Sequence, residues 1–277
     1  MKIYNTSKGI LIEQDNSFYL AAKNWDEFIN NDNLFKDKLT FIESSLPLTN
    51  ADDLLSNDLL PPIGSQEIWA SGVTYMRSRS ARMDESKDAG GGDFYDLVYK
   101  AERPELFFKS SAYRTVGSGQ QVRIRKDSGW NVPEPELTLM ISSSGKIAGY
   151  TIGNDMSSRD IEGENPLYLP QAKTYDKSAA IGPCIYLTDS PLPANTEIRM
   201  EILRNGSQEF CRNIRIDQIK RKFSELIEFL FREMSFPVGC LLMTGTGIIP
   251  PNNFTLEHGD EIRITIDSIG TLVNYVE

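Results

Sequence analysis

The chain has 277 residues, of which 40% are hydrophobic and 25% charged, a composition typical of a globular protein that buries a sizeable core. Its net charge of −10 and its lack of a basic run exclude an extended nucleic-acid-binding surface. No apolar run approaches the ~18 to 20 residues that span a bilayer, and we expect no secretory signal. The three cysteines are scattered, so we expect free thiols and a cytoplasmic location.

The first part of the chain differs in texture from the rest. Residues 1–62 combine short strand-like runs with polar stretches rich in Asn and Asp, and they end at the pair Pro61-Pro62. A proline pair after a polar segment is typical of a linker. We therefore predict a small N-terminal α/β domain over residues 1–62 and a main domain over residues 63–277.

The main domain reads as a succession of short strands separated by Gly, Pro and Asn turns. The strand candidates cover residues 68–75, 105–110, 136–142, 146–153, 184–188, 197–206, 241–248 and 261–276. This pattern predicts an α+β fold that is mainly β, with a sandwich or barrel-like body.

Helices are expected to be few. Residues 221–234 carry apolar side chains at helical spacing, and residues 93–101 form a second candidate that Asp93 could cap. The charged, glycine-rich stretch over residues 84–96 is interpreted either as a closing lid or as a passive surface loop.

Two glutamates mark one strand, in the stretch WNVPEPELTLM. Side chains at i and i+2 project from the same face of a strand, so Glu134 and Glu136 should lie together. The stretch SSSGKIAG predicts a hairpin turn, which would bring Asp155 close to this pair. Three carboxylates suit a hard divalent cation such as Mg²⁺ or Mn²⁺, although spacing alone fits two solvated glutamates on an edge strand better.

The order of several motifs resembles the fumarylacetoacetate hydrolase superfamily. The motifs are VPEPEL, GYTIGNDMSSRD, GENPLYLPQAKTYD, MTGTG and HGDEIRITIDSIGTLVN. The resemblance covers residues 68–276 and implies a mixed β-sandwich roll behind a small N-terminal domain, assembled as a homodimer or a higher homo-oligomer. It also implies a divalent cation, Mg²⁺ or in its place Mn²⁺ or Ca²⁺, held by Glu134, Glu136 and Asp155.

The resemblance further implies that Lys173 faces the substrate as a base or proton shuttle and that Thr246 contacts the substrate. Glu162 is a candidate acid for a departing hydroxyl group, with an ordinary charged loop residue as the alternative. An anionic substrate favours a guanidinium partner, for which Arg77 is the candidate, unless Arg77, Arg79 and Arg82 form a solvated basic face. The remaining candidates are Tyr168 and Gln171 for substrate hydroxyl groups and Arg159 as support for the metal loop.

One departure from the family bears on the reaction. Many hydrolytic members carry the motif NY-x-x-H-x-x-E, whose His–Glu dyad activates water, whereas this chain reads GVTYMRSRSARM. Ser78 and Ala81 stand at the two positions of the dyad. The single histidine, His258, is predicted to be a surface turn residue, which argues against hydrolysis of a carbon–carbon bond.

The runs RPELFFKSS and GENPLYLPQAKTYD resemble the 2-keto-3-deoxy-arabinonate dehydratase-like branch of the superfamily. This resemblance implies dehydration of a 2-keto-3-deoxy sugar acid of the pentonate type in sugar acid catabolism. A metal-stabilised enolate would form on loss of a C3 proton, followed by loss of the C4 hydroxyl. Two alternatives remain open: a hydrolase or decarboxylase of a 2-oxo or diketo acid, and a non-catalytic protein that binds a metal or a sugar acid.

Overall fold

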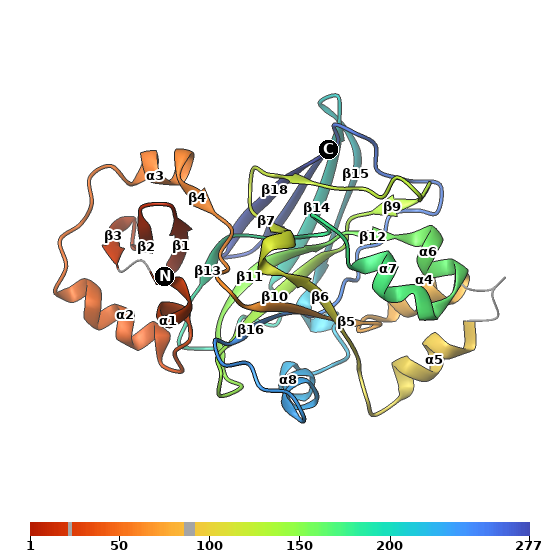
Figure 1. The fold of residues 1–277 in the computed structure, drawn as a ribbon, viewed down its shortest axis with the longest axis horizontal. Helices are drawn as coiled ribbons and strands as arrows, with labels where there is room; N and C mark the ends of the chain where they lie inside the picture. Colours follow the sequence, from red (N-terminus) through yellow and green to blue (C-terminus); the bar gives the residue numbers. More distant parts are fainter. Residues whose placement is uncertain (22–23, 86–91) are drawn as a thin grey trace.

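The computed structural model describes residues 1–21, 24–85 and 92–277, and strands dominate it (Figure 1). Within these ranges one large mixed sheet has eleven strands, nine of them in the order β3-β2-β1-β13-β11-β10-β16-β5-β6, with β4 beside β1 and β7 beside β13. Its strands are β1 (Lys2–Thr6), β2 (Gly9–Gln14), β3 (Ser17–Ala21), β4 (Leu59–Leu60), β5 (Glu67–Gly72), β6 (Glu105–Ser111), β7 (Thr115–Val116), β10 (Pro135–Ile141), β11 (Ile147–Asp155), β13 (Ala179–Tyr186) and β16 (Cys240–Met243).

A second sheet packs its apolar face on the first. In the described ranges it has five strands in the order β15-β14-β17-β18-β8, and a two-stranded sheet joins β12 to β9. These strands are β8 (Gln121–Val122), β9 (Asn131–Val132), β12 (Ser157–Ser158), β14 (Glu197–Arg204), β15 (Ser207–Arg215), β17 (Glu261–Ile266) and β18 (Gly270–Val276). Leu139 of β10, Met200 of β14 and Ile264 of β17 share one buried cluster, so the two sheets enclose a common core.

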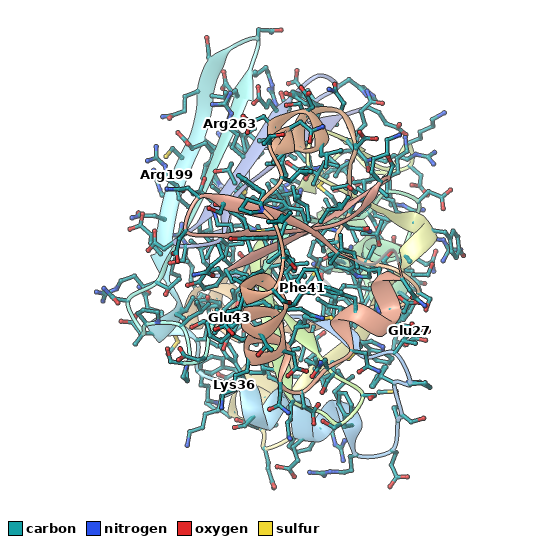
Figure 2. The ribbon with its side chains drawn as sticks, turned by 90° about the vertical axis from the view of Figure 1, so that its left-hand side faces the viewer. Glu27, Lys36, Phe41, Glu43, Arg199 and Arg263 are labelled. Carbon is teal, nitrogen blue, oxygen red and sulfur yellow. The ribbon has the colours of Figure 1, made fainter. Side chains whose placement is uncertain are left out.

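The outer face of the second sheet is charged, as strand alternation requires. Figure 2 shows Arg199 and Arg263 on this face, and each forms an ion pair two residues along its own strand, with Glu201 and Glu261. The predicted α+β, mainly β sandwich is therefore confirmed.

Helices lie at the edges of this body. They are α1 (Trp25–Ile29), α2 (Leu34–Glu43), α3 (Ala51–Asn57), α4 (Met76–Glu85), α5 (Gly92–Lys100), α6 (Arg159–Glu164), α7 (Leu169–Lys173) and α8 (Phe223–Phe231), with 3-10 turns at Ala112–Arg114, Pro166–Tyr168 and Ile216–Gln218. The predicted helix over residues 221–234 is confirmed as the shorter α8, which buries Leu226, Ile227 and Leu230. None of the helices in the described ranges combines the length and the apolar character needed to cross a bilayer.

The N-terminal segment continues the main sheet. Strand β1 pairs antiparallel with β13, where Ile3 lies opposite Ile185, and both side chains belong to a second buried cluster that also contains Leu241 of β16. Helices α1 to α3 lie beside these strands at the left of Figure 1. The sheet thus crosses residue 62, and the domain boundary placed there stays a prediction.

Two local predictions concern the surroundings of the site. Strands β10 and β11 form the predicted antiparallel hairpin, with Glu136 opposite Gly153, and its turn contains Gly145 at φ +78°. The predicted helix over residues 93–101 is confirmed as α5. The lid predicted over residues 84–96 stays a prediction, since residues 86–91 and the side chain of Asp93 lie outside the described residues.

Candidate metal centre and substrate cleft

Three carboxylates meet at the end of the β10–β11 hairpin. Glu134, Glu136 and Asp155 are 4%, 1% and 1% exposed, and one ligand oxygen from each lies within 4.8 Å of the other two. The backbone N–H of Asp155 donates to the carbonyl oxygen of Glu134 at 2.9 Å, which holds the end of β11 against the start of β10. The hairpin pairing therefore brings together residues that are 19 to 21 positions apart in the sequence.

Each of these carboxylates has one oxygen held by a donor of the protein. Arg159 Nη2 lies 2.7 Å from Glu134 Oε1, and Lys109 Nζ lies 2.6 Å from Asp155 Oδ1. The backbone N–H of Gly245 donates to Glu136 Oε2 at 2.5 Å. Since a carboxylate has two oxygens, each of the three retains a second oxygen for another partner.

Lys173 contacts two of those second oxygens. Its Nζ lies 2.6 Å from Glu134 Oε2 and 2.9 Å from Asp155 Oδ2. The side chain is 1% exposed and projects from the last residue of α7, with Nζ 5.9 Å from the centre of the Phe107 ring. Lys173, which the family resemblance places against the substrate, thus adjoins the carboxylate cluster.

Burial governs the electrostatics of the centre. It raises the pKa of Glu136 well above the usual value, and repulsion by Asp155 and Glu134 adds to this, while Lys173 and the Gly245 N–H act in the opposite direction. Burial also lowers the pKa of Lys109, which the neighbouring Asp155 opposes. Removing one partner of a buried ion pair typically lowers protein stability by about 3–5 kcal/mol. Each of these buried charges is therefore stabilised by its oppositely charged neighbour.

The turn after β16 requires glycine at Gly245. Its backbone has φ +91°, a left-handed conformation that side chains rarely adopt. A Cβ atom there would meet Thr74 Oγ1 at 2.0 Å and the Ser71 carbonyl oxygen at 2.9 Å. Glycine thus allows the close approach that aims the Gly245 N–H at Glu136.

The donor set fits a hard divalent cation. It consists of carboxylate oxygens alone, which are the ligands that Mg²⁺ and Mn²⁺ prefer over the softer nitrogen and sulfur donors of zinc sites. Burial is the main cause of the raised pKa of Glu136, and repulsion by Asp155 and Glu134 adds to it. A cation between the three carboxylates would relieve that repulsion. Glu134, Glu136 and Asp155 are the residues that would hold it.

A cleft opens onto the carboxylates and Lys173. Its other lining residues are Ser71, Gly72, Val73, Ser78, Glu105, Phe107, Arg159, Leu169, Gly245, Thr246 and Ile249. Polar and charged side chains outnumber apolar ones around the cleft, so its lining suits a polar ligand. Of the residues predicted to contact substrate, Thr246 lies in this lining and is 5% exposed.

Other sequence candidates lie elsewhere among the described residues and do not line the cleft. Arg77 is exposed on α4, and Tyr168 and Gln171 are exposed on and beside α7. Positions two apart on a helix point in nearly opposite directions, so Gln171 points outward where Lys173 points inward. The side chains of Arg79 and Arg82 lie outside the described residues.

Glu162 is buried, but it too is absent from the lining of the described cleft. It sits in α6 and accepts a hydrogen bond from Ser157 Oγ at 3.1 Å. This hydrogen bond links α6 to the segment that follows Asp155, and it therefore stabilises the position of that segment without reaching the cleft.

Three residues of β6 at or beside the site escaped the sequence analysis. Glu105 and Phe107 line the cleft, and Lys109 lies against Asp155. Glu105 and Phe107 share one strand face by alternation, whereas Lys109 lies at a register shift in the β5–β6 pairing, between Phe108 and Ser110. The spacing of residues in RPELFFKSS could have identified the cleft residues of this strand, but only if β6 were already known to lie beside the site.

The structure also shows the site at which hydrolytic family members carry the water-activating His–Glu dyad. Ser78 lines the cleft and donates from Oγ to the Tyr75 carbonyl oxygen at 2.8 Å, whereas the side chain of Ala81 lies outside the described residues. His258 is an exposed turn residue whose Nδ1 contacts the carbonyl oxygen of Glu277. The prediction that the single histidine is a surface residue is confirmed.

Known proteins resemble this chain over most of its length. A protein of Haloferax volcanii described as a probable 2-keto-3-deoxyxylonate dehydratase is 45% identical over 216 residues, which are 78% of this chain and 73% of that protein. The 2-dehydro-3-deoxy-D-arabinonate dehydratase of Saccharolobus solfataricus is 42% identical over 218 residues, again 78% and 73% of the two chains.

Solved structures agree with these relatives. A 2-keto-3-deoxy-D-arabinonate dehydratase complexed with magnesium and 2,5-dioxopentanoate superposes with a TM-score of 0.84 at 32% identity, covering 100% of this chain and 99% of the other. Residues 75–277 match the family model of the fumarylacetoacetate (FAA) hydrolase C-terminal domain. The chain belongs to the fumarylacetoacetate hydrolase family.

Proposed function

We propose that this protein is a divalent-metal-dependent dehydratase of a 2-keto-3-deoxy sugar acid of the pentonate type. Two relatives that are 42% and 45% identical carry dehydratase names for such substrates. A structural neighbour is complexed with magnesium and 2,5-dioxopentanoate, a compound that differs from a 2-keto-3-deoxy pentonate by one water molecule.

The observation that carries the proposal is the geometry of the carboxylate cluster. Glu134, Glu136 and Asp155 each have one oxygen held by Arg159, Gly245 or Lys109, and they converge within 4.8 Å beside Lys173. A rigid set of carboxylates next to an amine supports proton removal from a carbon that is activated by a neighbouring carbonyl group.

We propose Mg²⁺ as the resident cation, with Mn²⁺ or Ca²⁺ as a substitute. When bound, a divalent cation supplies Lewis-acid stabilisation for the negative charge that develops on the keto oxygen of a 2-oxo acid. Glu134, Glu136 and Asp155 would hold the cation, and Arg159 and the Gly245 N–H would keep two of these carboxylates in place.

Lys173 is the proposed base. Its unprotonated amine would accept the proton from C3 of the substrate, and the electron pair of that C–H bond would form the new double bond to C2. Phe107 lies beside Lys173 Nζ and limits access of water to it. The short α7 ends at Lys173, so the amine projects from a backbone position that the helix fixes.

The acid for the departing C4 hydroxyl is better placed at Glu105 than at Glu162, because Glu105 lines the cleft. Its carboxyl group occupies the space over Gly72, where a Cβ atom would meet Glu105 Oε2 at 2.1 Å. A protonated Glu105 would give its proton to the C4 oxygen while the enolate electrons form a C3=C4 double bond and the C4–O bond breaks, so that water leaves. Movement of one proton from C5 to C3 and of the C5 hydroxyl proton to C4 would then give the C5 aldehyde without any oxidant. Thr246 and Ser78 supply hydroxyl groups that can bind polar atoms of the substrate.

Among the described residues, the lining of the cleft argues against the hydrolytic alternative. A serine lines it where hydrolytic members of the family have a histidine, and the sequence has its single histidine at His258. We further propose a cytoplasmic location, which the free Cys184, Cys211 and Cys240 support, and a homodimer or higher homo-oligomer, as the family resemblance implies.

A substrate panel tests the proposal. Purified protein with Mg²⁺ would receive 2-keto-3-deoxy pentonates and hexonates, and aldehyde and pyruvate would be measured separately. We expect a pentonate to give a semialdehyde of unchanged carbon number and no pyruvate. Pyruvate formed in step with a second fragment would instead identify carbon–carbon bond cleavage.

A further inference from the structure

Two buried lysines contact the same metal-ligand candidate through different oxygens. Lys109 is 0% exposed and Lys173 is 1% exposed. Lys109 Nζ lies 2.6 Å from Asp155 Oδ1, whereas Lys173 Nζ lies 2.9 Å from Asp155 Oδ2. The two cations therefore occupy opposite sides of one carboxylate.

Lys109 joins three elements that build the centre. Besides Asp155, its Nζ donates to the Met156 carbonyl oxygen at 2.9 Å and to the carbonyl oxygen of Lys173. The ammonium group, which carries three N–H donors, therefore has one ion-pair partner and two hydrogen-bond acceptors. Lys109 thus links β6 to the end of β11 and to the last residue of α7.

We propose that Lys109 is a positioning residue of the metal centre. By holding Asp155 Oδ1 it turns Asp155 Oδ2 towards the other carboxylates, and by holding the Lys173 carbonyl oxygen it fixes the backbone from which the amine of Lys173 projects. One side chain thereby sets both the third ligand and the base. This inference rests on the proposed function, because it assigns Lys109 a role in that same site.

The two lysines should respond differently to a cation. Lys173 contacts Glu134 Oε2 and Asp155 Oδ2, the oxygens left available by Arg159 and Lys109, so a bound cation competes with its ammonium group. The partners of Lys109 are the opposite oxygen of Asp155 and two backbone carbonyls. These contacts can persist when a cation binds.

Lysine labelling of the wild-type protein tests this division of roles. An amine-acylating reagent would be applied with and without Mg²⁺, the labelled fractions of Lys109 and Lys173 would be read by mass spectrometry, and Mg²⁺ binding would be measured calorimetrically in the same preparation. We expect Mg²⁺ to raise labelling of Lys173 several-fold and to leave Lys109 protected.

Each outcome of the labelling experiment has a distinct meaning. If Mg²⁺ binds and the two lysines respond alike, the positioning role of Lys109 is overturned while the proposed function stands. If Mg²⁺ does not bind, the metal centre itself is refuted, and the inference fails with it.

A pair of variants gives a second measurement. Lys109→Met removes the proposed positioning charge, whereas Lys177→Met removes a lysine just beyond α7 that pairs with Glu277, a carboxylate outside the centre. Loss of a partner that orients a metal ligand typically lowers metal affinity roughly 10- to 100-fold. We expect a loss of this size in calorimetric Mg²⁺ or Mn²⁺ affinity for Lys109→Met and wild-type affinity for Lys177→Met.

Turnover as a function of Mg²⁺ concentration separates positioning from simple destabilisation. A positioning defect shifts the half-saturating Mg²⁺ concentration upward by the same factor as the binding constant. A defect in folding lowers the plateau without moving the midpoint. Wild-type metal affinity in folded Lys109→Met would overturn the inference, and if this variant fails to fold, the labelling of the wild-type protein decides.

Discussion

Replacing Glu136 by glutamine should make the protein more stable without metal and less stable with it. Glu136 is 1% exposed, and its pKa is raised by burial and by the carboxylates of Asp155 and Glu134. Glutamine keeps the shape of the side chain, removes the charge and can still accept the hydrogen bond from the Gly245 N–H. The variant therefore tests whether the three carboxylates form a site that is completed by a cation.

The size of the effect follows from the spacing of the cluster. The ligand oxygens lie at most 4.8 Å from one another. Two unit charges at that distance repel by about 3.5 kcal/mol at an effective dielectric constant of about 20. Glu136 faces two such neighbours, while loss of its attraction to Lys173 and of a charge-assisted hydrogen bond, worth about 1.5–3 kcal/mol, acts against the gain. A net stabilisation on the order of 1–3 kcal/mol remains, which corresponds to a rise in Tm of roughly 2–8 °C.

Scanning calorimetry near neutral pH measures both halves of this prediction. With chelator, Glu136→Gln should unfold at a higher temperature than the wild type. With Mg²⁺ at about 1,000 times its Kd the wild type gains about 4.1 kcal/mol, which exceeds the stabilisation of the variant, so the order should reverse. Glu162→Gln is the matched control, since Glu162 is 2% exposed but lies outside the cluster. The reasoning is refuted if Glu136→Gln is the less stable protein without metal, or if Mg²⁺ raises its Tm as much as that of the wild type.

Three further predictions follow from the same centre. The pKa of Glu136 is raised in the folded protein, so protonation of this group favours the folded state at low pH, and the contribution is lost as the pH rises through the pKa of the folded state. Calorimetry should therefore show metal-free stability falling and Mg²⁺ affinity rising as the pH increases above 4.5, the ordinary pKa of this group. A flat profile would contradict this. Gly245→Ala places a Cβ atom 2.0 Å from Thr74 Oγ1 and should lower Mg²⁺ affinity at least tenfold, roughly the loss expected for an orienting partner, whereas Gly206→Ala, at another positive-φ glycine with open space around it, should leave that affinity unchanged. Glu105→Gln should lower kcat roughly 100-fold, as loss of a general acid does, while Glu162→Gln should keep most of the activity, and the reverse order would return the acid role to Glu162.

The carboxylate cluster was predictable because it depends on local pairing. Glu134 and Glu136 share a strand face by alternation, and the hairpin turn at Gly145 sets the register that returns Asp155 to them. A short hairpin leaves few alternative registers. For this reason the sequence pattern of a single hairpin predicted the meeting of three side chains that are buried in the fold.

The contribution of β6 was not predictable in the same way. Lys109 and Glu105 reach the centre only because β6 pairs with β5 at the edge of the sheet, and β5 pairs in turn with β16. These are long-range pairings that leave no local trace in the sequence. A lysine in a strand usually lies in solvent, so its complete burial beside Asp155 follows from tertiary structure alone.

The helical candidates show a different limitation. Arg77, Tyr168 and Gln171 have side chains suited to an anionic, hydroxylated substrate, and they stand close in sequence to the cleft residues Ser78 and Lys173. On a helix the neighbouring position lies about 100° away, so one residue can line the cleft while the next is exposed. Placing these side chains required the rotational orientation of α4 and α7 about their helix axes. The sequences of such short polar segments do not specify that orientation.

The central claim is that a metal held by Glu134, Glu136 and Asp155 is required for dehydration of a 2-keto-3-deoxy pentonate. The most direct test is one NMR time course with chelator-treated protein, to which excess Mg²⁺ is added after an initial period. The account predicts no conversion before Mg²⁺ and afterwards one product with an aldehyde proton and no methyl signal from pyruvate. Conversion at the full rate before Mg²⁺ is added, or a pyruvate signal after it, would contradict the account.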